Sequence, residues 1–123
     1  MNNVKRLILI LLIIPVVSGC ALFQSEDEGN LIDTENLNEG SWIGFTGEHH
    51  SNSEYVYTES IDYNPSNNYI LNRNAYISYF NDDDFLKTVQ HAGGNEIDTV
   101  EDANNIVISF NRDRIDIIEL IRE

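Results

Sequence analysis

After residue 40 the chain consists of short segments rich in β-branched and aromatic residues, and this pattern constrains the fold more than any other feature. Turn-forming residues separate the segments at intervals of about 8–12 residues, a spacing typical of an antiparallel β-sandwich or barrel. The pattern predicts an all-β fold, an antiparallel β-sandwich over residues 40–123. Strands are predicted at residues 41–46, 54–61, 69–71, 75–80, 85–89, 97–100, 106–110 and 115–121.

The last of these segments fits two kinds of secondary structure. Ile115, Ile118 and Ile121 would share one face of a helix, whereas Ile115 and Ile117 alternate as they would in a strand. The high content of β-branched residues favours the strand. We therefore predict that the chain ends in a β-strand.

Two polar stretches predict tight turns. In residues 64–67, Asn-Pro-Ser-Asn, the proline presets φ for the second position of a turn. Residues 81–84, Asn-Asp-Asp-Asp, offer oxygen ligands that suit calcium, but they lack the glycine and the distal glutamate of an EF-hand loop. We predict a solvated hairpin turn at residues 81–84 and no metal site there.

The N-terminus has the three parts of a secretory signal peptide. Lys5 and Arg6 provide the charged start, residues 7–17 are apolar, and Ser18 and Gly19 provide small side chains before a cleavage site. The apolar run is short for a membrane-spanning helix, which needs about 20 residues. An ordinary membrane anchor is the alternative, and the run length disfavours it.

Cys20 is the only cysteine, and the segment that ends in Ser18-Gly19-Cys20 resembles the lipobox of bacterial lipoproteins. The resemblance implies cleavage between Gly19 and Cys20 and a diacylglyceryl group on the Cys20 thiol. It also implies attachment to the extracytoplasmic face of the cell membrane, and the Asn- and Ile-rich composition suits a low-GC Gram-positive host. With no second cysteine, an intrachain disulfide is excluded.

Removal of residues 1–19 would leave 5 basic and 21 acidic side chains, a net charge of −16. Such a charge excludes nucleic acid as a partner, because phosphates require a basic surface. It also opposes docking on anionic lipid headgroups, so the lipid itself must provide the membrane attachment. Residues 20–39 are predicted to form the lipidated cysteine and a flexible acidic tether, with Leu31, Ile32 and Leu37 making the first contact with the domain.

The segments after residue 60 follow a particular order. They are Ser60-Ile61, Asn64-Pro65-Ser66, Tyr69-Ile70-Leu71, residues 75–83, Phe85-Leu86, Thr99, Ala103-Asn104, residues 106–110 and Ile117-Ile118-Glu119. This order resembles the jelly-roll modules of glycoside-hydrolase accessory domains and of phage tail and baseplate proteins. One departure is Ser66-Asn67, where such modules commonly hold glycine. The resemblance implies a jelly-roll sandwich, carbohydrate binding and room for a structural calcium ion without assigned ligands.

Carbohydrate binding of that kind relies on aromatic faces laid against sugar rings. Trp42, Tyr55 and Tyr57 are the candidates for ligand binding, since Tyr55 and Tyr57 share one face of a predicted strand. The alternative is that all three are packing residues, which is more usual in a sandwich this small. The residues therefore fit both a sugar platform and a half-buried aromatic cluster.

No residue pattern predicts catalysis. The chain contains no nucleophile elbow, no zinc-protease helix motif and no phosphate loop, and its acidic residues are too numerous for any one pair to be informative. His49 and His50 are not predicted to bind a metal, because adjacent side chains point to opposite sides of a strand. A polar loop at residues 48–53 is expected there. We predict a protein without a cofactor, a metal or an enzymatic activity.

Three functions remain open from the sequence. The first is a lipid-anchored envelope lipoprotein whose sandwich binds a glycan or an envelope protein. The second is a prophage-encoded lipoprotein that excludes a second phage or modifies the host surface. The third, an envelope enzyme, is the least favoured.

Overall fold

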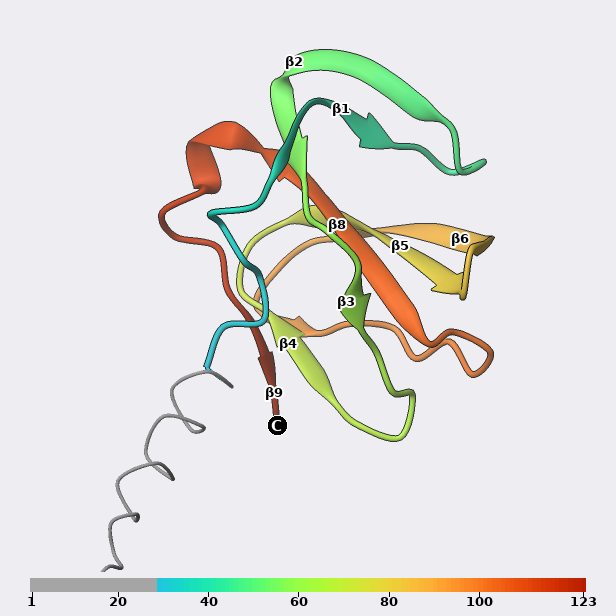
Figure 1. The fold of residues 1–123 in the computed structure, drawn as a ribbon. Coiled ribbons are helices and arrows are strands. Elements are labelled where there is room, and N and C mark those ends of the chain that lie inside the picture. Colours follow the sequence, from blue (N-terminus) through green and yellow to red (C-terminus); the bar gives the residue numbers. More distant parts are fainter. Residues whose placement is uncertain (1–28) are drawn as a thin grey trace, which may run out of the picture.

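The computed structural model describes residues 29–123, which form nine strands and one short 3₁₀ helix, η1 (Figure 1). The predicted signal peptide, the cleavage site at Gly19 and the lipidated Cys20 lie outside the described residues. The elements are β1 (Asn38–Ile43), β2 (His49–Tyr57), β3 (Ile61–Asp62), β4 (Tyr69–Leu71), β5 (Ala75–Asn81), β6 (Asp84–His91), β7 (Asn95–Glu96), β8 (Asn105–Asn111), η1 (Arg112–Arg114) and β9 (Leu120–Arg122).

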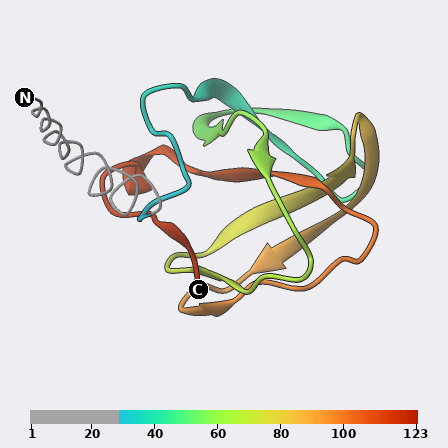
Figure 2. The ribbon, with the colours of Figure 1, turned by 60° about the horizontal axis from the view of Figure 1, so that its bottom comes forward.

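The strands form two antiparallel sheets that pack together (Figures 1 and 2). The larger sheet has the order β1-β2-β8-β5-β6, and β3 pairs with the first residues of β8. The smaller sheet has the order β7-β4-β9. Strand β8 lies at the centre of this sheet because it pairs with β2 on one side and with β5 on the other. The prediction of an all-β antiparallel sandwich is confirmed.

The main core lies between the two sheets. Alternate residues of the larger sheet point into it, as the two-residue period of a strand requires. Leu71 of β4 and Leu120 of β9 are cross-strand neighbours in the smaller sheet, and both are fully buried. The fully buried core side chains of β2, β5 and β8 are Val56, Ile77, Tyr79, Ile106, Ile108 and Phe110.

Three tyrosines explain why the predicted strand at residues 97–100 does not form. Tyr79 Oη donates to the Asp98 carbonyl at 2.7 Å, and the Tyr63 hydroxyl donates to the same oxygen at 3.4 Å while accepting from Val100 N. Ile97 N donates to the Tyr69 carbonyl at 2.9 Å. Because tyrosine hydroxyls satisfy this backbone, the prediction of a strand here was wrong, and pairing is limited to β7 at Asn95–Glu96.

The predicted C-terminal strand at residues 115–121 is largely wrong. After η1, Ile117 N and Ile118 N both donate to the Arg114 carbonyl, which continues the local helical turns. The side chain of Asn72 then accepts from Glu119 N at 2.6 Å and donates to the Ile117 carbonyl at 2.8 Å. These long-range bonds end the turn, and the strand is confined to β9.

The predicted polar loop at residues 48–53 is also wrong, because β2 already begins at His49. The turn between β1 and β2 is short: Gly44 N donates to the Glu48 carbonyl at 2.9 Å. Trp42 then pairs with His50 and Ile43 with His49. Backbone pairing with β1 compensates for the low strand propensity of this polar segment.

The ordered domain begins before the predicted boundary at residue 40. Ile32 is buried, and Leu31 N donates to the Leu120 carbonyl at 2.8 Å. Asn30 contacts the same segment, since its side-chain oxygen accepts from Leu120 N and its amide donates to the Ile118 carbonyl. The tether predicted over residues 20–39 is therefore too long, whereas the predicted packing of Leu31, Ile32 and Leu37 on the domain is confirmed.

Both predicted turns are present. Asn67 N donates to the Asn64 carbonyl at 2.9 Å, with Pro65 at the second position. Asn81 pairs with Asp84 across the β5–β6 hairpin, and Asp82 adopts a φ of 52°. Aspartate tolerates this left-handed conformation better than most residues do.

Candidate functional site

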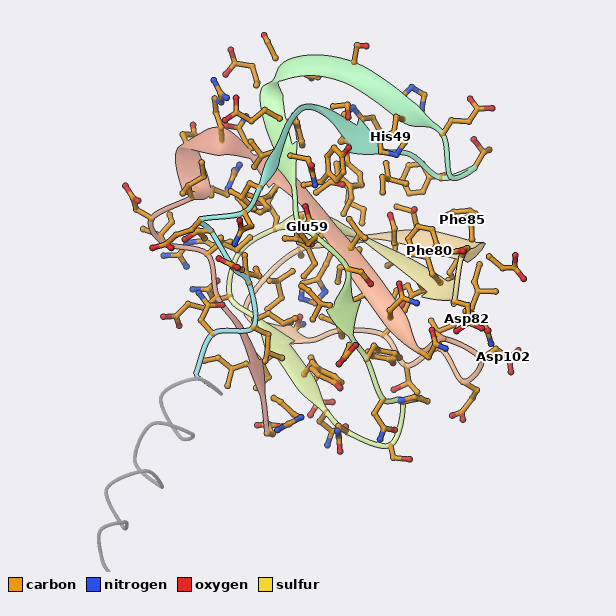
Figure 3. All side chains as sticks on the ribbon, viewed as in Figure 1. His49, Glu59, Phe80, Asp82, Phe85 and Asp102 are labelled. Carbon is orange, nitrogen blue, oxygen red and sulfur yellow. The ribbon has the colours of Figure 1, made fainter. Side chains whose placement is uncertain are left out.

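A cleft in the described part of the chain lies beside β3, at the end of the larger sheet where the β5–β6 hairpin turns. Its volume is about 570 Å³, within the range of about 300–1,000 Å³ that is usual for small-molecule sites. Phe80 and Asp82 are labelled there in Figure 3. We call it the Phe80 cleft, and it is lined by Ser60, Asp62, Phe80, Asp82, Asp83, Asn104, Asn105 and Val107.

Strand pairing brings these residues together from distant parts of the sequence. Asn105, the first residue of β8, pairs with Phe80 of β5 on one side and with Asp62 of β3 on the other. Paired residues of neighbouring strands direct their side chains to the same face of a sheet. The three side chains therefore form one row across the sheet.

The acidic turn at the rim is held by asparagine side chains. Asp82 N donates to Asn104 Oδ1 at 2.9 Å, and Asn104 Nδ2 donates to Asp82 Oδ1 at 2.9 Å. Asn105 Nδ2 donates to the Asp82 carbonyl at 3.1 Å, and Asn81 Nδ2 donates to the Asp102 carbonyl at 2.8 Å. These bonds join the β5–β6 hairpin to the loop before β8, so the rim is preorganised.

The floor of the cleft is apolar. Phe80 and Val107 are both half-buried. The Phe80 ring packs edge-to-face on Phe85, with centroids 5.7 Å apart and an interplanar angle of 71°. Such an arrangement holds the Phe80 ring in place while leaving part of its surface in the cleft.

The rim offers mainly hydrogen-bond acceptors. Ser60 Oγ donates to Asn105 Oδ1 at 2.9 Å. The amide group of Asn104 donates to Asp82, and that of Asn105 donates to Asp82 and to Asn104 Oδ1. By contrast, no hydrogen bond within the described residues reaches the carboxylates of Asp62 and Asp83. A ligand in this cleft must therefore supply donors such as hydroxyl or N–H groups.

A second cleft, of about 490 Å³, adjoins the first and shares Ser60 and Asp62 with it. Glu59, labelled in Figure 3, lies on its wall. We call it the Glu59 cleft. It is lined by Leu31, Asp33, Thr58, Glu59, Ser60, Ile61, Asp62 and Arg122, so it lies between the edge of the larger sheet and the segment that carries β9.

The predicted ligand-binding aromatics lie elsewhere on the larger sheet. Trp42 stacks on His50 with centroids 4.9 Å apart and on Tyr76 with centroids 4.5 Å apart, and each pair has an interplanar angle of 29°. Tyr55 completes the cluster, 6.1 Å from Trp42. Because neighbouring rings cover much of the indole surface, packing is the role that this geometry favours for Trp42.

Tyr57 is not part of that cluster. Its ring packs edge-on against His49, with centroids 5.1 Å apart. Tyr55 lines a depression of about 30 Å³, a volume that suits about one water molecule. The structure thus brings Trp42 and Tyr55 together, places Tyr57 apart from them, and puts none of the three in the two large clefts.

The lining residues of the Phe80 cleft were not singled out from the sequence as a ligand site. The sequence predicts residues 81–84 as a hairpin turn, and the structure contains this turn. Asn104 and Asp82 are 22 positions apart, so their reciprocal hydrogen bonds have no local signal. Only the pairing of β5 with β8 makes them neighbours.

Residues 29–123 contain no group of three or more histidine, cysteine, aspartate or glutamate side chains that could hold a metal ion. His49 contacts Ser41 and Tyr57, whereas His50 stacks on Trp42, so the two histidines do point to different sides of β2. The same part of the chain includes no helix that is long and apolar enough to cross a membrane.

Comparison with known proteins found no relative of this chain. The chain matches no family model, no curated protein and no solved structure.

Proposed function

We propose that the chain is a lipid-anchored lipoprotein of the cell envelope, and that its β-sandwich is a non-catalytic module that binds a glycan in the Phe80 cleft. The anchor is the diacylglyceryl group that the lipobox-like sequence predicts on Cys20. The domain would then be held at the extracytoplasmic face of the membrane.

The chemistry of the Phe80 cleft carries the glycan proposal. Sugars present hydroxyl groups around their edges and C–H groups on their faces. Carboxylates such as those of Asp62 and Asp83 accept hydrogen bonds from hydroxyl groups, and bonds to ionised acceptors are stronger than neutral ones. The half-buried Phe80 ring offers an apolar surface for the C–H face. The combination of a fixed apolar floor and a rim of acceptors supports a sugar as the ligand.

The position of the cleft also supports the proposal. The described chain begins beside β9, where Asn30 is bonded to Ile118 and Leu120. The Asp82 hairpin lies at the opposite end of the sandwich (Figures 1 and 3). An anchor that precedes Asn30 would thus leave the cleft on the side away from the attachment point.

A glycan array tests the binding function. We expect the full-length lipoprotein, in detergent, to bind at least one envelope-type glycan. The double variant Asp62→Asn/Asp83→Asn should weaken that binding at least about tenfold, because it removes two charged acceptors.

Asp116→Asn is the matched control, since Asp116 is exposed and lines neither large cleft. Circular dichroism should show that all variants are folded. Absence of binding to every glycan on the array, or equal binding by the wild type and the double variant, would contradict the proposal.

The anchor is tested separately by metabolic labelling with a radioactive fatty acid. The wild-type chain should incorporate the label and remain with the membrane fraction. Cys20→Ser should incorporate none, because the serine hydroxyl does not replace the thiol as the acceptor. Labelling of the Cys20→Ser chain would rule out lipidation at this residue.

A further inference from the structure

The Phe80 cleft and the Glu59 cleft are not independent depressions. Ser60 and Asp62 line both of them, and both residues are exposed. The clefts lie on either side of the short segment that contains β3. A ligand that leaves the Phe80 cleft past Asp62 therefore enters the Glu59 cleft directly.

The segment between the clefts is held firmly. Ile61 and Asp62 pair with Ile106 and Asn105 of β8. Thr58, which precedes them, is buried: its backbone N–H donates to the Ile108 carbonyl at 3.0 Å, and its Oγ1 accepts from Ile108 N at 3.1 Å. The two clefts consequently keep a fixed relation to each other, and a ligand that spans them meets a preformed surface.

Each cleft has room for a small molecule, with volumes of about 570 Å³ and about 490 Å³. Each also combines apolar surface with carboxylates: Phe80 and Val107 lie in the first cleft, and Leu31 and Ile61 lie in the second, which Arg122 also lines. Apolar surface beside carboxylates in two neighbouring clefts suits a polymer of similar units better than it suits one small molecule.

The hydrogen-bonding groups that line the Phe80 cleft indicate which kind of sugar unit it can bind. The Ser60 hydroxyl group, both amide N–H groups of Asn105 and one of the two amide N–H groups of Asn104 donate within the protein. Asp62 and Asp83 accept nothing from the described residues. An amino sugar with a free amino group carries an ammonium group in place of one hydroxyl group, so it supplies three N–H donors and a positive charge. It therefore pairs with the carboxylates of Asp62 and Asp83 better than a neutral hexose does.

We propose that the ligand is an extended amino-sugar chain whose neighbouring units occupy the Phe80 cleft and the Glu59 cleft, with the chain crossing the sheet edge at Asp62. This inference rests on the proposed glycan-binding function and adds the length and class of the glycan. The Glu59 cleft acts as a second subsite, which only a chain longer than one cleft can reach.

Isothermal titration calorimetry on the full-length chain in detergent tests the inference. The probes are β-1,4-linked glucosamine oligomers of two, four and six units, with β-1,4-linked glucose oligomers of the same lengths for comparison. The affinity should rise at least about tenfold from two to six amino-sugar units, because the second subsite is filled without a second loss of translational freedom. The glucose series should bind at least about tenfold more weakly at each length, because it lacks the ammonium group that pairs with the carboxylates.

Two glutamate variants test whether the increase in affinity with oligomer length comes from the Glu59 cleft. Glu59→Gln should reduce the affinity for the hexamer several-fold and leave the affinity for the dimer unchanged. The matched control is Glu54→Gln, since Glu54 is an exposed residue of β2 that lines neither large cleft. It should change neither affinity.

The other outcomes separate this inference from the proposed function. Equal affinity for the dimer and the hexamer would overturn the second subsite and leave glycan binding intact. Equal affinity for the glucose and amino-sugar series would overturn the ligand class. Binding of neither series, together with a negative glycan array, would overturn the glycan-binding function and this inference with it.

Discussion

Tyr79 shows how one polar group can be buried without loss of stability. Its side chain is fully buried, yet its hydroxyl group donates to the Asp98 carbonyl at 2.7 Å. Tyr63 lies edge-on to it, with ring centroids 5.6 Å apart, and donates to the same carbonyl. Residues 97–100 thus form hydrogen bonds with two tyrosine hydroxyl groups where a strand would pair with a neighbouring strand. The conformation of this loop depends on these bonds.

Tyr79→Phe should lower the free energy of unfolding by about 1–2 kcal/mol, because the shorter of the two hydrogen bonds to the Asp98 carbonyl is lost. Chemical denaturation followed by circular dichroism measures the change. Tyr57→Phe is the matched control, since Tyr57 is only half-buried and packs through its ring. An equal loss in both variants would show that the Asp98 contact is unimportant.

The same tyrosines predict a response to alkaline pH. Burial raises the pKa of Tyr79 and of Tyr63 above the ordinary value, which is about 10 for an unfolded chain. The unfolded state therefore loses these protons first, so the contribution to stability is complete below about pH 10 and is lost as the pH rises above that value. Denaturation curves between pH 8 and pH 11 should show this decline, and Tyr79→Phe should make it shallower. A stability that stays constant through this range would contradict the assignment.

At the scale of the elements, the larger sheet also buries polar side chains. Ser78 of β5 and Thr88 of β6 are cross-strand partners whose hydroxyl groups lie 2.8 Å apart, and both residues are buried. A hydroxyl pair of this kind satisfies itself without water.

Thr88→Val should cost about 1–3 kcal/mol of stability, because it leaves the buried Ser78 hydroxyl without its partner. The double variant Ser78→Ala/Thr88→Val should recover much of that loss, since neither position then carries a hydroxyl group. Urea denaturation of the two single variants and the double variant checks this cycle. Additive losses would mean that the two hydroxyl groups do not depend on each other.

The connection between β6 and β7 depends on a glycine. Gly93 has a φ of +95°, and a Cβ atom there would lie 2.6 Å from the backbone carbonyl carbon of Arg73. Gly94 has a φ of +90° but no atom within 4 Å of the same hypothetical position. A comparison of substitutions at the two glycines therefore distinguishes the cost of backbone strain from the cost of steric overlap.

Gly94→Ala should cost about 1–2 kcal/mol through its backbone conformation alone. Gly93→Ala should cost about 1–3 kcal/mol more, because the β4–β5 connection must move away from the added methyl group. Thermal unfolding of the two variants side by side gives the difference. Equal midpoints would show that the contact with Arg73 relaxes without cost.

At the scale of the whole molecule, the formal net charge of −14 is the dominant electrostatic property. Ion pairs such as Arg112–Glu39 and Arg114–Asp113 are present in the described part, but acidic side chains outnumber basic ones by 21 to 7 in the sequence. Carboxylates therefore repel one another over most of the surface, and this repulsion opposes the compact state.

Salt should stabilise the domain for this reason. Raising NaCl from 20 to 500 mM should increase the unfolding midpoint by several degrees, because a gain of about 1 kcal/mol shifts the midpoint of a domain of this size by about 4–8 °C. Differential scanning calorimetry measures the shift. KCl should give the same result, since screening does not depend on the cation, and a sodium-specific effect would contradict the argument.

Much of the fold was predictable because its signals are local. Strands β4, β5 and β8 have strong β-branched and aromatic patterns, and the turns at Pro65 and Asp82 have the expected residue types. The errors fall where long-range contacts replace local preference. In residues 97–100, the backbone forms hydrogen bonds with tyrosine hydroxyl groups instead of pairing as a strand. In residues 115–119, the backbone forms hydrogen bonds with the Asn72 side chain.

The sequence by itself determined the all-β class, the acidic surface and the lipobox-like start, because each is a property of composition or of neighbouring residues. The tertiary structure alone decided where a ligand can bind. Phe80, Asp82 and Asn104 line one cleft only after β5 pairs with β8, and the Glu59 cleft adjoins it at Ser60 and Asp62, beside β3. The physical reason is that β8 pairs with strands that are distant in sequence, so the residues that meet in the cleft share no local pattern.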